Sequence, residues 1–316
     1  MIRFLLARLG EVVGVMLAVS FLVYLVLEHD AASVAVKVIG QYSTEGQRAL
    51  WLSENGYDAP FLVRYVTWLG RFVTGDWGSS THFREQVTVL LPQHLARTGI
   101  LAGTAFAIIV PVAFLFGIVA GVREGSWADR VVSFIAVATT SIPEFASAVF
   151  LSAIFVFWLG ILPGASTMTS GFEWQQLVLP CLVIVLYDFG YVARMVRAAM
   201  ADVMAQPYIR TALMKGASPA RIVLRHALRN ALVAPITVIM LQIPWLISGV
   251  LVTEVFFAYK GFGTLLYQAC LNSDVALIEA CAMTSVFVIV STQLISDVLY
   301  TLLNPRIRFG LRRGEA

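Results

Sequence analysis

Residues 99–121 read GILAGTAFAIIVPVAFLFGIVAG, an apolar run without a single charged side chain. A run of this length can cross about 30 Å of lipid hydrocarbon as an α-helix. The whole chain has the same character, because its 316 residues are 59% hydrophobic and only 13% charged, whereas a soluble domain carries about 25% charged residues. The composition therefore indicates a helical integral membrane protein, and it excludes a soluble globular enzyme and a disordered chain.

Six apolar runs are long enough to span a membrane. They cover Leu9–Leu27, Gly99–Gly121, Val131–Gly160, Leu177–Met195, Leu232–Phe256 and Ala280–Leu303. The predicted fold is all-α, with six transmembrane helices. The first run is longer than the apolar region of a secretory signal peptide. We therefore expect it to be retained as an anchor, although Ser33-Val34-Ala35 resembles a cleavage site.

Basic residues predict the orientation, because short loops rich in Arg and Lys stay in the cytoplasm. With the N-terminus inside, most of the 22 basic residues fall on the cytoplasmic side. They lie in the N-terminal tail, after the second and fourth apolar runs, and in the C-terminal tail. Both termini are therefore predicted to be cytoplasmic.

The long loop of residues 28–98 would then lie on the extracytoplasmic (periplasmic) side of the membrane. Four aromatic residues in it, Phe61, Tyr65, Trp68 and Phe72, have helical spacing, which predicts one amphipathic helix. Such a helix could lie on the membrane surface or cap the bundle. It could equally offer a docking surface for an extracytoplasmic partner, and the sequence leaves both interpretations open.

The loop between the fourth and fifth runs is the most informative, and residues 208–230 read YIRTALMKGASPARIVLRHALRN. Tyr208–Lys215 is predicted to be a helix that Gly216 ends, because glycine readily adopts the left-handed conformation. Ser218 suits the N-cap and Pro219 the first position of a second, basic helix. A plain cytoplasmic connector would need only its basic residues. We therefore predict a rigid helix–glycine–helix elbow that could receive force from a soluble partner.

This elbow resembles the EAA-type coupling loop of ABC importer permeases, most closely those of the dipeptide/oligopeptide/nickel family. The residues that carry the resemblance and would couple to the ATPase are Tyr208, Arg210, Thr211, Ala212, Lys215, Gly216, Ser218, Pro219 and Arg221. Other segments are similar to that family as well, namely Gly75–Ser80, Gly125–Arg130, Ser141–Pro143, Leu228–Leu232, Gly261–Gly263 and Asn304–Arg308. The resemblance covers nearly the whole chain.

The resemblance implies a permease subunit of an ATP-driven importer in the cytoplasmic (inner) membrane of a bacterium. The implied partners are a homologous second permease, two ABC ATPase subunits, an extracytoplasmic substrate-binding protein and membrane lipid, but no nucleic acid. The implied organisation is a tail with the first helix (1–27), an outer loop region (28–98) and a five-helix core (99–316) that holds the coupling loop 199–231. Peptides or similar small solutes are the expected cargo, while nickel or other metal chelates, opines and glycosides also fit the family.

The chain is not expected to be an enzyme or to hold a cofactor. Its lysines are Lys37, Lys215 and Lys260, and none is followed by Ser or Thr, so the sequence has no P-loop. ATP and Mg would therefore bind to partner subunits. The histidines are scattered and predict no metal site. The cysteines Cys181, Cys270 and Cys281 are interpreted as packing residues.

Acidic residues inside apolar runs are candidates for the translocation pathway, because charges within a membrane are costly and usually functional. The candidates, with the polar and proline residues beside them, are Ser141, Pro143, Glu144, Asp188 and Glu254. Pro143 should break the helix of the third run. Structural roles stay open for each acid: contact between helices for Glu144, a buried hydrogen-bond acceptor for Asp188, and contact with water for Glu254.

Two other classes of protein are less favoured. A secondary transporter driven by an ion gradient predicts internal repeats and broken helices in both halves. The sequence has one interrupted run and no clear repeat. An intramembrane enzyme needs a nucleophile and base, or a metal set, at one depth, but His94 and His226 fall on opposite sides of the predicted membrane.

Overall fold

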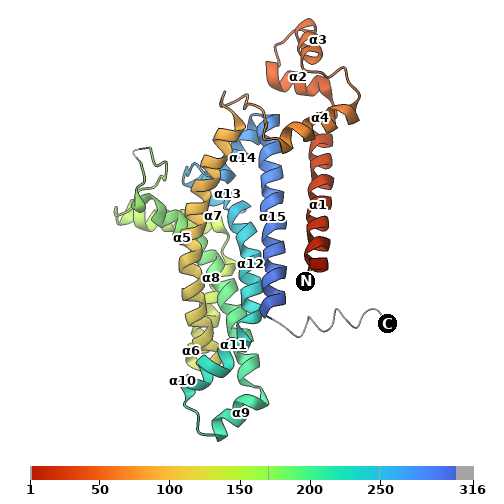
Figure 1. The fold of residues 1–316 in the computed structure, drawn as a ribbon. Helices are drawn as coiled ribbons and strands as arrows, with labels where there is room; N and C mark the ends of the chain where they lie inside the picture. Colours follow the sequence, from red (N-terminus) through yellow and green to blue (C-terminus); the bar gives the residue numbers. More distant parts are fainter. Residues whose placement is uncertain (1, 170, 249, 304–316) are drawn as a thin grey trace. The chain divides into compact units, whose positions relative to one another are not determined.

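The computed structural model describes residues 2–169, 171–248 and 250–303, and within these ranges the regular elements are helices (Figure 1). The all-helical class is therefore confirmed for this part of the chain. The chain divides into two compact units, the first formed by Met1–Thr98 with Lys260–Ser291 and the second by Gly99–Tyr259 with Thr292–Ala316. The Asn304–Arg308 motif and the basic C-terminal tail lie outside the described residues.

The first unit is built on the long helix α1 (Ile2–Glu28), and Figure 1 shows short helices gathered at the end of α1 that is distant from the N-terminus. The short helices of this unit are α2 (Ala31–Ile39), α3 (Glu45–Glu54), α4 (Phe61–Val73) and α14 (Phe262–Leu271). Helix α3 begins with a capping box, in which Thr44 and Gln47 satisfy each other's backbone N–H groups.

Helix α4 confirms the amphipathic helix predicted from its aromatic spacing. Its rings pack on α1, where Tyr24 lies 5.2 Å from Trp68 and 5.5 Å from Tyr65 between ring centroids. Phe21 of α1 meets Phe61 and Tyr65 edge to face. The aromatic face of α4 is therefore partly covered by α1 inside the first unit, although no residue of α4 is fully buried. The docking interpretation of this loop stays a prediction.

Helices α5 (Val87–Val122) and α15 (Val275–Leu303) contribute residues to both units. In the first unit, α5, α14 and α15 share a small apolar core that includes Leu91, Phe262 and Cys281. Asp274, directly before α15, accepts hydrogen bonds from the Ser80 hydroxyl and the His82 backbone N–H. This carboxylate therefore fixes the loop that precedes α5 to the start of α15.

The second unit surrounds α8 (Trp174–Met204), which packs against α6 (Trp127–Ser141), α7 (Glu144–Ser152) and α12 (Val233–Ser248). Small residues permit these close approaches. A Cβ atom added to Gly190 of α8 would lie 2.2 Å from the carbonyl oxygen of Ala136 in α6. A Cβ added to Gly121 of α5 would lie 2.6 Å from the carbonyl oxygen of Arg197. The helices are thus packed nearly backbone to backbone, as is common between membrane helices.

Within the described residues, four helices are long and apolar enough to cross a membrane, or up to six when each bent pair counts as one span. The straight candidates are Leu6–Glu28, Val87–Val122, Trp174–Met204 and Val275–Leu299. The bent candidates are Trp127–Ser141 with Glu144–Trp158, bent by 99°, and Pro219–Ala231 with Pro235–Leu246, bent by 55°.

The helices α5 and α8 extend beyond the predicted second and fourth runs, and two other predicted runs are interrupted in the structure. The third run breaks at Pro143 as expected, but at nearly a right angle, and it ends in a π-helical turn, η1 (Ala153–Trp158). The fifth run is not a single helix, because α12 ends at Ser248 and α13 (Leu251–Phe256) begins after it. The sequence carries Ser248-Gly249 at this point, a signal that the prediction of a single span did not use.

The packing role predicted for the cysteines holds for Cys181 and Cys281, which are buried in the second and first unit respectively. It is wrong for Cys270, which is exposed. Cys270 lies in the last turn of α14, beyond the residues of that helix that enter the core.

Candidate functional site

The elbow forms as predicted in its main features. Its first helix, α9 (Pro207–Met214), ends at Gly216, which has a left-handed φ of +77°. The N–H of Ala217 bonds to the carbonyl of Ala212 at 3.2 Å, and the N–H of Gly216 bonds to that of Leu213 at 2.9 Å. This pair of bonds is a Schellman motif, so Gly216 ends the helix for the reason that the sequence suggested.

The second arm of the elbow starts at Pro219 and consists of α10 (Pro219–Arg221), the π-helical η2 (Ile222–Ala227) and α11 (Leu228–Ala231). Ser218 occupies the N-cap position with an extended backbone, but its side chain makes no capping hydrogen bond, contrary to the prediction. Pro219, whose ring pre-sets the helical φ, therefore defines the start of this arm.

Two isoleucines anchor the elbow to the second unit. Ile209 of α9 and Ile222 of η2 are each 1% exposed and belong to the same apolar core as Val196 and Met200 of α8. Figure 1 shows α9 and α10 at one end of this unit, beyond the end of α6. The elbow is thus a protrusion held by buried side chains and not a free loop.

The outward side of the elbow combines exposed apolar and basic side chains. Met214 is 86% exposed, and Tyr208 and Leu224 are exposed as well. The exposed basic residues are Arg210, Lys215, Arg221, Arg225 and Arg229. The other predicted coupling residues have local roles: the Thr211 hydroxyl donates to the Pro207 carbonyl, and Ala212 packs at the edge of the core. Exposed apolar side chains on a rigid protrusion are typical of a protein contact.

An ion pair that the sequence analysis missed joins α6 to α8. Arg197 donates from Nε to Oδ1 of Asp129 at 2.9 Å and from NH2 to Oδ2 at 2.8 Å. The Asp129 side chain is only 6% exposed, and it also accepts a bond from the Gly125 N–H. Arg197 lies in the last two turns of α8, shortly before α9 begins, so the pair fixes the helix that leads into the elbow. The available signal was an acid and an arginine flanking neighbouring apolar runs.

Asp188 lines a cavity of about 260 Å³ in the second unit. Its side chain is buried and accepts a hydrogen bond from the Gln242 amide of α12. The rings of Tyr187 and Trp245 stack in the same cavity with centroids 5.0 Å apart. The cavity therefore presents one buried carboxylate beside a stacked pair of aromatic rings, with Arg194 also in its lining. A carboxylate and aromatic rings both attract cationic groups.

The other predicted pathway residues lie around the break in the third run. Glu144 opens α7 and accepts a hydrogen bond from the Thr253 hydroxyl of α13. Glu144 also lies close enough to Asp188 for electrostatic repulsion. The Ser141 hydroxyl bonds only to the Val137 carbonyl of its own helix among the contacts identified, and Pro143 marks the break.

Of the two interpretations left open for Glu254, contact with water is wrong. Glu254 is fully buried, because α13 packs against both α7 and α8. The structure thus brings Glu144 and Asp188 into one neighbourhood and places Glu254 inside the packed helices. Within the described ranges, no group of three or more His, Cys, Asp or Glu side chains could hold a metal ion.

Comparison with known proteins identifies the family that this arrangement resembles. The family model described as binding-protein-dependent transport system inner membrane component matches residues 113–309. That range includes the elbow, the Asp129–Arg197 pair and the Asp188 cavity.

Individual relatives match over almost the full length. A putative peptide transport system permease protein of Brucella abortus is 34% identical over 313 residues, which are 98% of this chain and 100% of the relative. The glutathione transport system permease protein GsiC of Salmonella choleraesuis is 32% identical over 310 residues, with 98% and 100% covered. The oligopeptide transport system permease protein AppB of Bacillus subtilis is 29% identical over 320 residues, also with 98% and 100% covered.

Proposed function

Since the chain belongs to the family of binding-protein-dependent transport system inner membrane components, we propose that it forms half of a translocation pathway for peptides or similar small solutes. It is a permease subunit of an ABC importer and a multi-pass protein of the inner membrane. The other half of the pathway would come from a homologous second permease. Two separate ABC ATPases would bind ATP and Mg, and an extracytoplasmic binding protein would deliver the cargo.

The proposed topology has six spans with both termini in the cytoplasm. The four straight candidate spans and the two bent pairs supply six segments. The concentration of basic residues on the elbow supports placing it in the cytoplasm. The loop of residues 28–98 would then face the binding protein.

The elbow is the observation that carries the proposal. It is rigid, because a Schellman motif ends its first helix and a proline starts its second arm. Its outer surface offers both apolar and basic side chains to a partner, while Ile209 and Ile222 join it to the core. Such a protrusion can pass a push from a soluble subunit to the membrane helices, because packed cores transmit displacement.

The proposed mechanism starts when ATP closes the partner ATPases against the elbow. The movement passes through Ile209 and Ile222 to α8, and the Asp129–Arg197 pair makes α6 move with α8. The break at Pro143 lets the two arms of the third span rearrange separately. The Asp188 cavity would in this way become alternately accessible from the two sides.

Peptide cargo is proposed on two grounds. The relatives are named for the transport of peptides, oligopeptides and glutathione. The Asp188 carboxylate beside the stacked Tyr187 and Trp245 rings suits a positively charged amino group, since a carboxylate and aromatic rings both attract cations. A peptide with a free amino terminus carries such a group.

The test is uptake of a labelled dipeptide by proteoliposomes that contain the assembled importer, with the binding protein on the outside. We expect uptake when ATP is enclosed with the ATPase subunits, and none with a non-hydrolysable ATP analogue. Uptake driven by an ion gradient without ATP would instead identify a secondary transporter. ATP-driven uptake of another solute class, with no uptake of peptides, would reject the cargo and keep the importer.

A further inference from the structure

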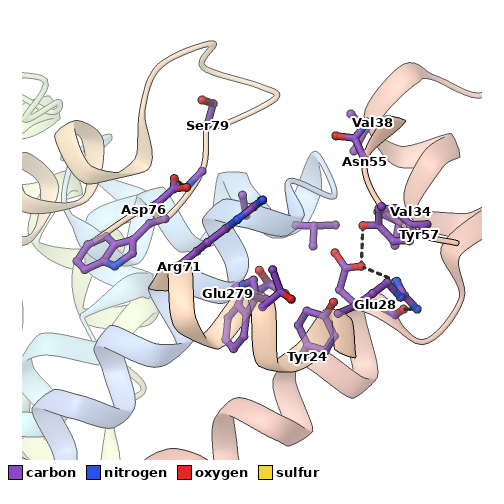
Figure 2. A pocket seen from close by; sticks show the side chains of 18 of the residues that line it. Tyr24, Glu28, Val34, Val38, Asn55, Tyr57, Arg71, Asp76, Ser79 and Glu279 are labelled. Atoms are coloured by element: carbon purple, nitrogen blue, oxygen red, sulfur yellow. Dashed lines mark hydrogen bonds and ion pairs between the residues drawn. The ribbon is translucent and has the colours of Figure 1, made fainter. Parts of the chain in front are cut away.

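A separate cavity lies inside the first unit, away from the elbow and from the Asp188 cavity (Figure 2). Its volume is about 530 Å³, within the range of small-molecule sites. The cavity is enclosed by the last turns of α1, by α4 and by the first turn of α15. Residues of α2 and α3 lie at its rim. The cavity is therefore large enough for a ligand and is formed by elements that the transport mechanism above does not use.

Two buried carboxylates face this cavity, Glu28 from the end of α1 and Glu279 from the start of α15 (Figure 2). Their residues are only 7% and 5% exposed, and they lie close enough to repel each other. Glu28 is partly satisfied, because the Tyr57 hydroxyl donates to it at 2.6 Å and Arg64 lies 3.5 Å away. Burial next to this carboxylate also raises the pKa of the Tyr57 hydroxyl, so Tyr57 remains a donor.

Glu279 lacks an equivalent set of partners. The Trp68 indole hydrogen-bonds to it, but its Oε1 atom is buried without a hydrogen-bond partner in the part of the chain that the structure describes. A buried carboxylate oxygen without a partner is costly. The acidic residues that line the cavity are Glu28, Asp76 and Glu279 and the basic ones are Arg64 and Arg71, so the lining has one more acidic than basic residue.

Aromatic rings supply a further part of the lining. Tyr24, Trp51, Tyr57, Trp68 and Trp77 all border the cavity. One of these rings already faces a cation, since the Arg64 guanidinium lies 4.7 Å above the Tyr57 ring centroid. Ring faces together with a carboxylate are the combination that recognises ammonium groups.

We propose that this cavity binds a primary ammonium group, with Glu279 as its counter-ion and the surrounding indole and phenol rings as its walls. Glu28 is the last residue of the candidate span Leu6–Glu28, and Glu279 lies near the start of the candidate span Val275–Leu299. Span ends lie at the depth of lipid headgroups. The ammonium group can therefore come from a phosphatidylethanolamine headgroup or from a soluble amine. The inference uses only the first unit, so it stands or falls independently of the proposed transport function.

The test is calorimetric titration of the full chain in dodecyl maltoside micelles, which contain no ammonium group. The probe is phenethylammonium, and phenethyl alcohol is its uncharged counterpart. We expect saturable binding of the amine and a much weaker response to the alcohol. Glu279→Gln should weaken amine binding about 10- to 100-fold, the range for loss of a hydrogen bond between charged groups. Glu45→Gln, the same change at an exposed position of α3, should bind like the unmodified chain.

Two further measurements make the test decisive. Trp51→Leu removes one ring from the wall and leaves both acids, and it should weaken binding roughly two- to fivefold. If Glu279→Gln does not fold, as judged by gel filtration, Trp51→Leu carries the test. Equal binding of amine and alcohol, or amine binding that is unchanged in whichever of these variants folds, would overturn the proposal.

The source of the ammonium group is distinguished by competition. Short-chain phosphatidylethanolamine should displace phenethylammonium if the headgroup is the natural ligand, and short-chain phosphatidylglycerol should not. A site for soluble amines would keep its phenethylammonium affinity in both lipids. Either result supports the ammonium site and assigns its source, whereas equal displacement by both lipids would overturn it, because the amine would then not be what is recognised.

Discussion

Asp129, at the start of α6, and Arg197, near the end of α8, are separated in the sequence by two apolar runs, yet they form two hydrogen bonds in parallel. This geometry requires the planar guanidinium group, because a lysine ammonium cannot donate to both carboxylate oxygens in the same way. Gly125 and Ser133 supply the remaining donors to Asp129. Asp129 is therefore fully satisfied only while Arg197 is present.

Arg197→Lys should destabilise the chain by about 1–3 kcal/mol, since it leaves a buried carboxylate incompletely paired. We expect a lower melting temperature in detergent and slower transport. Arg130→Lys is the matched control, because Arg130 is exposed and adjacent to Asp129 in the sequence. Equal melting temperatures for the two variants would show that the bidentate pair has no stabilising role.

Asp188 offers a second test at the residue scale. Asp188→Asn keeps the shape of the side chain and an acceptor for Gln242, but it removes the negative charge. If Asp188 holds the amino terminus of the cargo, uptake of dipeptides with a free amino group should fall about tenfold, while N-acetylated dipeptides should be affected much less. Asp202→Asn, at an exposed position of α8, is the control. An equal loss for both kinds of peptide would assign Asp188 a structural role.

At the scale of elements, the elbow depends on a single backbone conformation. Gly216 has a φ of +77°, and a Cβ atom added there would meet no atom within 4 Å. A substitution therefore acts through the backbone and not through a clash. Gly216→Val should disrupt the Schellman motif, because a β-branched residue is strongly disfavoured at positive φ.

We expect Gly216→Val to uncouple transport from the ATPase, so that peptide no longer stimulates ATP hydrolysis by the assembled importer. Gly160→Val is the control, because Gly160 also has a positive φ and free space around it but lies outside the elbow. Both variants should lose similar stability, and only the first should lose stimulation. Retained transport and retained ATPase stimulation in Gly216→Val would reject the elbow as the coupling element.

The crossing of α6 and α8 depends on a different glycine. Gly190→Ala places a Cβ atom 2.2 Å from the Ala136 carbonyl oxygen, so the helices must separate. Overpacking of this kind costs about 1–3 kcal/mol. Gly103→Ala in α5 meets no atom within 4 Å and gains helix propensity. Gly190→Ala should therefore lower the melting temperature and Gly103→Ala should hold or raise it. The opposite order would contradict the close crossing.

These elements also show what the sequence can predict. Local signals were sufficient for α4, whose aromatic spacing is helical, and for the elbow, whose glycine and proline act on adjacent residues. The break at Pro143 was predictable because proline removes a backbone donor and kinks or breaks a helix. Its 99° angle was not, because the packing of both arms against α8 decides the direction of the chain after the break.

Pairs between distant segments were beyond prediction for the same reason. The sequence marked Glu144 and Asp188 as costly charges but could not assign Thr253 and Gln242 as their donors. It placed Glu254 near water, whereas the packing of α13 buries it. The sequence could thus identify these acids because charged residues are rare in apolar runs. Their hydrogen-bond partners and their burial depend on contacts between distant segments of the folded chain.

For the whole molecule, the few charges matter more than the many apolar residues. The apolar runs identify the spans but do not determine the orientation of the chain, because an apolar helix is equally stable in the membrane in either orientation. The positive-inside rule predicts that the basic elbow lies in the cytoplasm and that the loop of residues 28–98 lies on the opposite side of the membrane. The orientation of the chain can therefore be tested with two exposed positions, one in each segment.

The test labels single cysteines that are introduced into a Cys270→Ser background. This background removes the exposed native cysteine, while Cys181 and Cys281 are buried. Asp58→Cys places a thiol at an exposed position of the long loop, and Met214→Cys places one on the elbow, where the native side chain is 86% exposed. A membrane-impermeant maleimide should label Asp58→Cys in intact spheroplasts and Met214→Cys only after lysis. Labelling of Met214→Cys in intact spheroplasts would place the elbow outside, where no ATPase can reach it, and both the orientation and the coupling mechanism would then be wrong.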